Sequence, residues 1–150
     1  MSDFMSLLKK PLDDIKKPQA LPAGLYPGQV KKYEFVEAPP GKEYKKIVRY
    51  HFGLTGWADG IDEGDKMEDL GSGLVEINLA KRQLRRDFYD NSLHRLKEFL
   101  ESFESIQTSG HSMEECLAMV VGLPVQIEVK QYMNQRTNEI GNEVGGVTGG

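Results

Sequence analysis

Residues 81–103, KRQLRRDFYDNSLHRLKEFLESF, contain the change of hydrophobic period that decides the fold. Up to Tyr89 the segment continues a stretch in which apolar and polar residues alternate, which is typical of a β-strand. From Asp90 onward, apolar residues recur every three or four positions, which is typical of an amphipathic helix. This helical stripe consists of Leu93, Leu96, Phe99, Leu100 and Phe103. A polar residue at 90–92 can cap the first turn, so the pattern predicts a helix over 92–104.

A second helix is marked at both of its ends. The segment Ser112-Met-Glu-Glu115 matches a capping box, and Gly122 is a typical helix terminator, so we expect a helix over 113–121. The hydrophobic period returns to two from Leu123. This alternation predicts a strand whose apolar face carries Val125, Ile127 and Val129. A short last strand is expected to run through Val144.

Upstream of the helices, the sequence predicts three strands. Alternating apolar residues indicate strands over 25–37 and 44–54, with a turn at Pro39-Pro40-Gly41 between them. A third strand is expected from Leu74 through Tyr89. The acidic, glycine-rich residues 56–73 do not follow the ligand order of an EF-hand, so we expect them to form a flexible, solvated loop.

The order of elements is therefore strand, strand, long strand, helical insert, strand, strand. The predicted fold class is α+β and mainly β: a small five-stranded OB-like barrel or a curved antiparallel sheet, with the helical insert between strands three and four. A chain of 150 residues is expected to form one such domain. The two helices should pack together at one end, with Leu96, Phe99 and Ile127 buried.

Both ends of the chain are expected to be flexible. Pro11, Pro18 and Pro22 prevent a long helix in the first segment, and the last segment is rich in glycine. The predicted organisation is a flexible N-terminal arm (1–23), an OB-like domain (24–144) and a flexible tail (145–150).

Cationic residues cluster in an otherwise acidic chain. The formal net charge is −4, which argues against coating of nucleic acid by bulk charge, yet four of the six residues at 81–86 are cationic and two aromatic residues follow closely. Cationic side chains attract phosphates and aromatic rings stack on bases, so the pattern indicates binding of single-stranded nucleic acid. Strand alternation sends Arg82 and Arg86 to the face opposite Lys81 and Arg85, so some of them are structural. The predicted nucleic-acid-binding residues are Lys31, Tyr33, Phe35, Trp57, Lys81, Arg82, Arg85, Arg86, Tyr89 and Lys130.

The sequence lacks a convergent set of catalytic groups. His51, His94 and His111 have no metal-ligand spacing, and no phosphate-binding loop motif occurs. Cys116 is the only cysteine, which excludes an internal disulfide and a cysteine metal cluster. No apolar run approaches the ~20 residues of a membrane span. We therefore expect a protein that is not an enzyme, with no cofactor, no metal and no membrane association.

Three segments resemble a family of small bacteriophage proteins. They are Leu21-Pro-Ala-Gly-Leu-Tyr26, the strand-to-helix segment Arg86–Leu100, and Ser112–Val144, and they span nearly the whole chain in the order of that family. These proteins are found near phage replication genes and are commonly regarded as OB-like single-stranded DNA-binding proteins. The resemblance implies a role in DNA replication or recombination in the cytoplasm of the infected bacterial host.

The resemblance also implies partners. Single-stranded DNA comes first, followed by replication or recombination proteins, and an OB-type edge strand can pair two copies into a homo-oligomer. Replicative single-strand binders often end in an acidic tail that recruits partners, whereas 145–150 read Gly-Gly-Val-Thr-Gly-Gly. Recruitment through such a tail is therefore not expected.

A second interpretation belongs to another class of protein. The chain can instead be a protein-interaction or virion-associated structural module that does not bind nucleic acid. The N-terminal arm, made basic by Lys9, Lys10, Lys16 and Lys17, would then make protein contacts, together with the acidic loop and the helix around 93–103. Salt-dependent binding of a single-stranded oligonucleotide separates the two interpretations.

Overall fold

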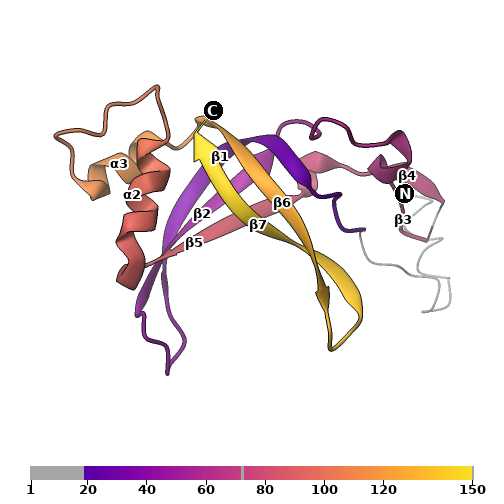
Figure 1. Ribbon diagram of the computed structural model, residues 1–150, viewed down its shortest axis with the longest axis horizontal. Coiled ribbons are helices and arrows are strands. Elements are labelled where there is room, and N and C mark those ends of the chain that lie inside the picture. Colours follow the sequence, from indigo (N-terminus) through magenta and orange to yellow (C-terminus); the bar gives the residue numbers. More distant parts are fainter. Residues whose placement is uncertain (1–18, 72, 150) are drawn as a thin grey trace, which may run out of the picture.

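The computed structural model describes residues 19–71 and 73–149. Its centre is a five-stranded antiparallel sheet in the order β5–β2–β1–β6–β7 (Figure 1). The strands are β1 (Gly24–Glu37), β2 (Lys46–Leu54), β5 (Gln83–Tyr89), β6 (Pro124–Asn134) and β7 (Glu139–Gly149). The prediction of a mainly β, curved antiparallel sheet is confirmed. The sheet is not closed into a barrel, because the edge strands β5 and β7 are not paired with each other.

Strand β1 belongs to both halves of the sheet. Its first residues pair with β6 and its later residues pair with β2, so the two halves cross in Figure 1. Gly28 lies where the two pairings overlap, opposite both Leu54 and Val125. A Cβ placed on Gly28 would lie 2.7 Å from the carbonyl oxygen of Gly53 and 2.7 Å from Cδ1 of Ile127. The strands approach so closely where the two pairings overlap that position 28 requires a residue without a side chain.

Two helices close one end of the folded sheet. They are α2 (Leu93–Glu101) and α3 (Met113–Met119), and both lie between β5 and β6 in the chain, as predicted for the helical insert. Both end earlier than expected, but the capping box is confirmed: Ser112 Oγ accepts a hydrogen bond from the Glu115 N–H at 3.2 Å. The helices lie side by side, as predicted (Figure 1).

Aromatic rings fill the core between the two halves of the sheet and α2. The predicted burial of Leu96, Phe99 and Ile127 is confirmed, with exposed fractions of 1%, 4% and 0%. The Phe99 ring lies 5.2 Å from the rings of both Tyr50 and Phe88. Tyr50 also donates its hydroxyl to the carbonyl oxygen of Leu117 at 2.8 Å, which fastens α3 to β2. The insert is therefore part of the core.

Both predicted boundaries of the central domain need correction. Leu21 is buried, donates its N–H to Asn142 Oδ1 at 2.7 Å and accepts a bond from Gln131 Nε2 at 2.8 Å, so residues 19–23 belong to the fold. Residues 145–149 are not a free tail, because they form the end of β7 and Val147 is buried there. The rest of the predicted arm, residues 1–18, and Gly150 lie outside the described residues.

The segment before β5 is more structured than its composition indicates. The predicted loop contains the 3-10 helix η2 (Glu63–Lys66) and strand β3 (Met67–Asp69), which pairs with β4 (Leu74–Glu76). The predicted long strand from Leu74 is interrupted by the 3-10 helix η3 (Leu79–Lys81). Ile77 is buried and donates its N–H to Lys66, which directs the chain away from a continuous strand.

Candidate nucleic-acid interface

The face of β1, β2 and β5 that points away from the core carries two rows of polar residues. The strand registers align Glu34 with Arg49 and Asp87 in one row. They align Lys32 with His51 and Arg85 in the next row. Alternation sends both rows to the face opposite Tyr50, whose side chain is fully buried. We call these six residues and Lys31 the outer face.

An ion pair neutralises two members of the first row, Arg49 and Asp87. Arg49 donates from Nε and Nη2 to the two carboxylate oxygens of Asp87 at 2.8 and 3.1 Å, and this hydrogen-bonded carboxylate raises the pKa of Arg49. Glu34 lies 3.2 Å from His51 Nε2. Lys32 and Arg85 are exposed and have no carboxylate partner within the described ranges. The uncompensated charge of the outer face is therefore positive.

Lys31 lies at a β-bulge beside this face. The register of β1 against β2 shifts between Val30 and Lys32, so Lys31 is an extra residue in β1. Its stem lies over Gly53, and its Nζ donates to Gln29 Oε1 at 3.2 Å. Because Gln29 carries no charge, Lys31 remains available to an anion.

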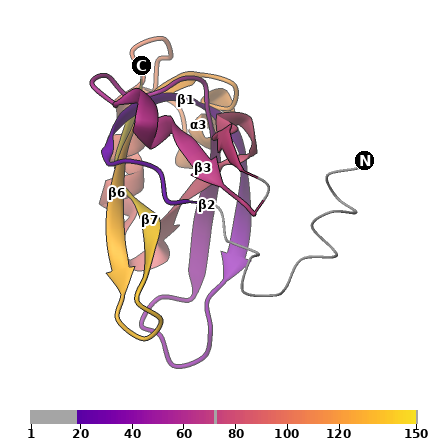
Figure 2. The same cartoon turned by 90° about the vertical axis from the view of Figure 1, so that its right-hand side faces the viewer.

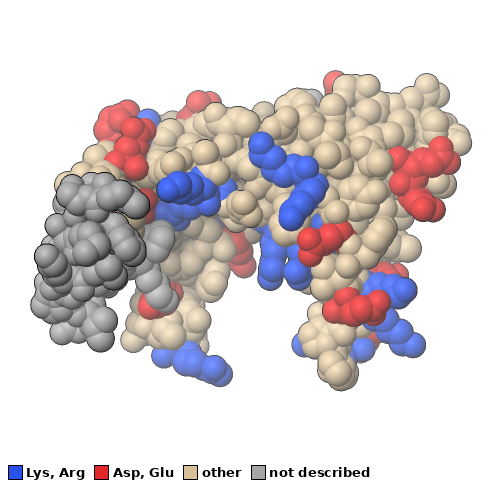
Figure 3. All heavy atoms as spheres, turned by 180° about the vertical axis from the view of Figure 1, so that it is seen from behind, with Lys and Arg blue, Asp and Glu red and all other residues tan. Residues whose placement is uncertain are grey.

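Two hairpins extend from the same side of the sheet, as Figures 1 and 2 show. The β1–β2 hairpin carries exposed Lys42, Lys45 and Lys46, and the β6–β7 hairpin carries exposed Arg136. The back view in Figure 3 shows the molecule hollowed between the hairpins, with Lys and Arg side chains gathered above the hollow. Lys and Arg side chains therefore gather beside one concave surface of the molecule.

Asp90 and Tyr89 hold the base of the β1–β2 hairpin in place. The Asp90 carboxylate accepts the N–H groups of Lys45 and Lys46 at 3.1 and 2.9 Å. The ring of Tyr89 packs against Tyr44, with 4.3 Å between centroids. Tyr89, predicted as a stacking ring, is thus half-buried in a contact that orients the lysines of this hairpin.

The structure brings only part of the predicted site together. Lys31, Arg85 and Tyr89 lie on or beside the outer face. Tyr33 and Phe35 point to the opposite face of β1, where Tyr33 packs 5.5 Å from Tyr50. Phe35 is 66% exposed, so it is the freer of the two rings.

Four other predicted residues lie elsewhere. Arg82 donates to Glu68 Oε1 at 2.9 Å, and Glu68 is buried, so this arginine compensates an interior charge. Lys81 is exposed in η3, beside a pocket that Arg82 and Glu68 also line.

Trp57 and Lys130 complete this group. Trp57 is half-buried, 6.1 Å from the Tyr26 ring, and the Lys66 ammonium lies 5.8 Å from its ring centre. Trp57 is therefore mainly a packing residue. Lys130 lies in β6, 3.4 Å from Glu128.

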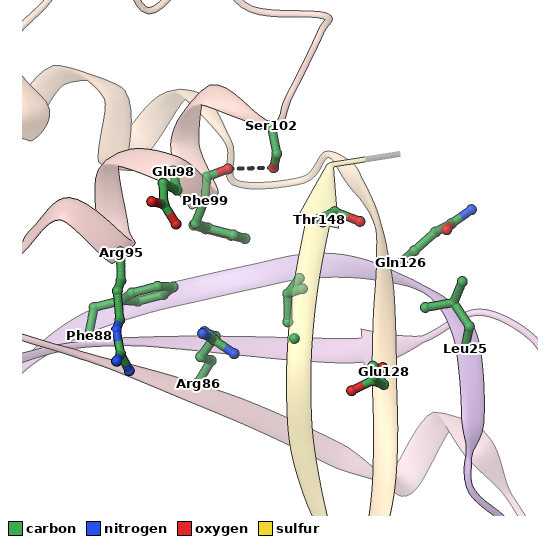
Figure 4. A pocket seen from close by; sticks show the side chains of 12 residues that line it. Leu25, Arg86, Phe88, Arg95, Glu98, Phe99, Ser102, Gln126, Glu128 and Thr148 are labelled. Carbon is green, nitrogen blue, oxygen red and sulfur yellow. Dashed lines mark hydrogen bonds between the residues drawn. The ribbon is translucent and has the colours of Figure 1, made fainter.

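Arg86 lies on the inner side of β5, next to a pocket that α2 and β7 also line (Figure 4). Its guanidinium lies 5.3 Å from the centre of the Phe88 ring, and Nη1 donates to the carbonyl oxygen of Gly145 at 3.5 Å. Burial, followed by the charge of Arg95, lowers the pKa of Arg86. Arg85 and Arg86 therefore face opposite sides of one edge strand.

Sequence reasoning missed several cations of this surface. Lys32 is aligned with His51 on the outer face because the register shifts at Lys31, and no local pattern announces such a shift. The lysines that flank Pro39-Pro40-Gly41 could have been found, because turn residues between two strands project into solvent. The missed cations are Lys32, Lys42, Lys45, Lys46, Arg95 and Arg136.

The described residues contain no group of three or more His, Cys, Asp or Glu side chains that could hold a metal ion. Within the same ranges, no helix is long and apolar enough to cross a membrane. Comparison with known proteins gives no match, either to a protein-family model or to a curated protein.

Proposed function

We propose that the protein is a non-catalytic, single-stranded DNA-binding protein of a bacteriophage that acts in DNA replication or recombination. One observation carries the proposal: the unpaired cations lie on the surface that an OB fold uses for ligands. The five strands of the main sheet, with helices between the third and fourth, have the order of this partly open Greek-key barrel. OB folds bind oligonucleotides on the face of strands two and three and on the loops between strands one and two and strands four and five.

In this protein, the corresponding elements are the outer face of β2 and β5 and the tips of the two hairpins. Arg85 and Lys32 supply charge at the centre, and Lys42 and Arg136 supply it at the hairpins. These side chains would hold phosphates. Phe35 is the freest ring but lies on the opposite face of β1, so it would stack only on a base that reaches past the outer face. Such contacts do not depend on base identity, so we expect little sequence selectivity and a preference for single strands over duplex.

The alternative, a protein-interaction or virion-associated module, is favoured by a different observation. Large apolar side chains are exposed near the end of the β6–β7 hairpin and in β4, where a protein partner would bury them. They are Tyr132, Met133, Ile140, Leu74 and Val75.

A salt titration with an oligothymidine of ~30 nucleotides tests the proposed function. We expect binding at micromolar protein concentration in low salt. Arg85→Gln should weaken it and reduce the slope of log K against log salt by about one, because one fewer counterion is released. Lys97→Gln, an exposed lysine on α2, is the matched control and should change neither quantity. Absence of micromolar binding by the unmodified protein would instead favour the interaction module.

A further inference from the structure

A pocket of about 460 Å³ lies where the edge strands β5 and β7 approach each other beside α2. Its size is within the range of small-ligand sites. Arginine and phenylalanine side chains form its inner wall, and β7 forms the opposite wall. The residues that matter here are Arg86, Phe88, Arg95, Phe99, Val147 and Thr148.

Two arginines in this pocket lack acidic partners. Two other arginines have carboxylate partners: Arg49 pairs with Asp87 at 2.8 Å, and Arg82 pairs with Glu68 at 2.9 Å. Arg86 and Arg95 form no such ion pair within residues 19–71 and 73–149. Each adds to the positive potential at the other, and an anion placed between them would be attracted by both.

The neighbouring groups hold Arg86 without neutralising it. The Phe88 ring lies under its guanidinium at 5.3 Å, and the Gly145 carbonyl accepts from Nη1 at 3.5 Å. A guanidinium held in this way has already lost much of its rotational freedom, so binding an anion costs less entropy. Arg95 lies on the α2 side of the same space, and both guanidinium groups lie on one side of β7 in Figure 4.

Two carboxylates also line the pocket, but they lie at its margins. Glu98 is farther along α2, and Glu128 lies on the other side of β7 from Arg86 (Figure 4). Glu128 lies 3.4 Å from the Lys130 ammonium. The space between the two arginines therefore keeps an excess of positive charge.

We propose that Arg86 and Arg95 bind a phosphate of the DNA strand, which passes from the outer face over the free edge of β5 into this pocket. This inference rests on the proposed function. Consecutive residues support the path, because Arg85 projects from the outer side of β5 and Arg86 from its inner side. The planar guanidinium suits two-point contact with phosphate oxygens. The strand would follow the hollow between the two hairpins seen in Figure 3.

Arg95→Gln is the decisive variant, because Arg95 is exposed and its loss should leave the fold intact. With the ~30-nucleotide oligothymidine at low salt, we expect affinity to fall on the order of threefold to tenfold and the salt slope to fall by about one. Arg86→Gln should have the same effect, and circular dichroism checks that it folds. Lys97→Gln, two residues from Arg95 and facing the pocket between α2 and α3, should bind like the unmodified protein.

The outcomes separate this inference from the function on which it rests. If Arg95→Gln binds like Lys97→Gln while Arg85→Gln binds more weakly, DNA binds but stays on the outer face, and the pocket has no part in it. If the unmodified protein does not bind the oligonucleotide, the proposed function fails and the inference fails with it.

Discussion

Arg86 in β5 donates a hydrogen bond of 3.5 Å to the carbonyl oxygen of Gly145 in β7. Gly145 is the residue that the register of β6 with β7 omits, between Val144 and Gly146, so it is a bulge whose backbone lies outside regular pairing. A side chain thus spans the gap that strand pairing would fill in a closed barrel. The bulge gives Arg86 a neutral partner and leaves its charge uncompensated.

Removing a negative charge from the outer face should tighten DNA binding. Glu34→Gln takes away the carboxylate that lies 3.2 Å from His51, so the neighbouring cations act on phosphates with less competition. We expect the affinity for oligothymidine to rise roughly twofold to fivefold at low salt and the gain to shrink as salt increases. Fluorescence anisotropy over a salt series measures both. Glu104→Gln, an exposed glutamate beyond α2, is the control, and an equal gain there would contradict a local effect.

Arg82 should matter for stability and not for DNA. Arg82→Gln leaves the buried Glu68 carboxylate with the Gln19 N–H as a neutral donor and no cation. We expect the free energy of unfolding in urea to fall by about 2–4 kcal/mol. The salt slope of DNA binding should stay unchanged. Lys81→Gln, one residue earlier and exposed, should alter stability by less than about 0.5 kcal/mol. Equal stability of the two variants would show that the ion pair contributes nothing.

Phe35 should contribute by stacking. Its ring is 66% exposed and lies 5.9 Å from the Tyr33 ring, with 82° between the ring planes, so most of the ring is free to receive a base. Phe35→Ala should weaken oligothymidine binding by about 1–3 kcal/mol and leave the salt slope unchanged, because no counterion is involved. Leu74→Ala removes a similarly exposed apolar side chain from β4 and serves as the control. If the two variants bind equally well, Phe35 is not a contact.

Gly28 should not tolerate a side chain. Gly28→Ala would place its Cβ 2.7 Å from a backbone oxygen in β2 and 2.7 Å from the buried side chain of Ile127. We expect a loss of about 1–3 kcal/mol in urea unfolding, since neither neighbour can move freely. Gly146→Ala is the matched control in β7, because a Cβ there meets no atom within 4 Å. A similar unfolding midpoint for both variants would contradict the crowding at Gly28.

The change of hydrophobic period at Asp90 and the capping box at Ser112 could be recognised in the sequence, because both signals are local. They predicted the helices, and alternation predicted β1, β2 and the start of β6 to within a few residues, whereas the strand predicted from Leu74 began well before β5. The glycine-rich sequence from Gly145 shows no alternation of apolar and polar residues, so it did not predict a strand. The end of β7 forms because it pairs with β6 and not because of its own side chains. Leu21 was missed for a similar reason, since its partners Gln131 and Asn142 lie far along the chain.

The candidate site was less predictable than the fold. The cations at 81–86 are close together in sequence, but the structure separates them. Lys81 lies in η3, Arg82 forms an interior ion pair, and the other two lie on opposite faces of β5. Alternation correctly placed Arg85 and Arg86 on opposite faces. It could not identify Glu68 or Arg95 as neighbours, because those contacts depend on tertiary packing.

The double membership of β1 also determines when this protein can fold. Tyr26 pairs with Ile127, about 100 residues away, so half of the central strand has no partner until β6 has been synthesised. The helices cannot stabilise the incomplete sheet before β6 is present, because α2 packs on a core that includes Ile127. Closing so long a loop has a large entropic cost, and the contacts that offset this cost form only when both halves of the sheet assemble. Folding should therefore be late, slow and all-or-none on the ribosome, and nascent chains that lack β6 should remain sensitive to protease.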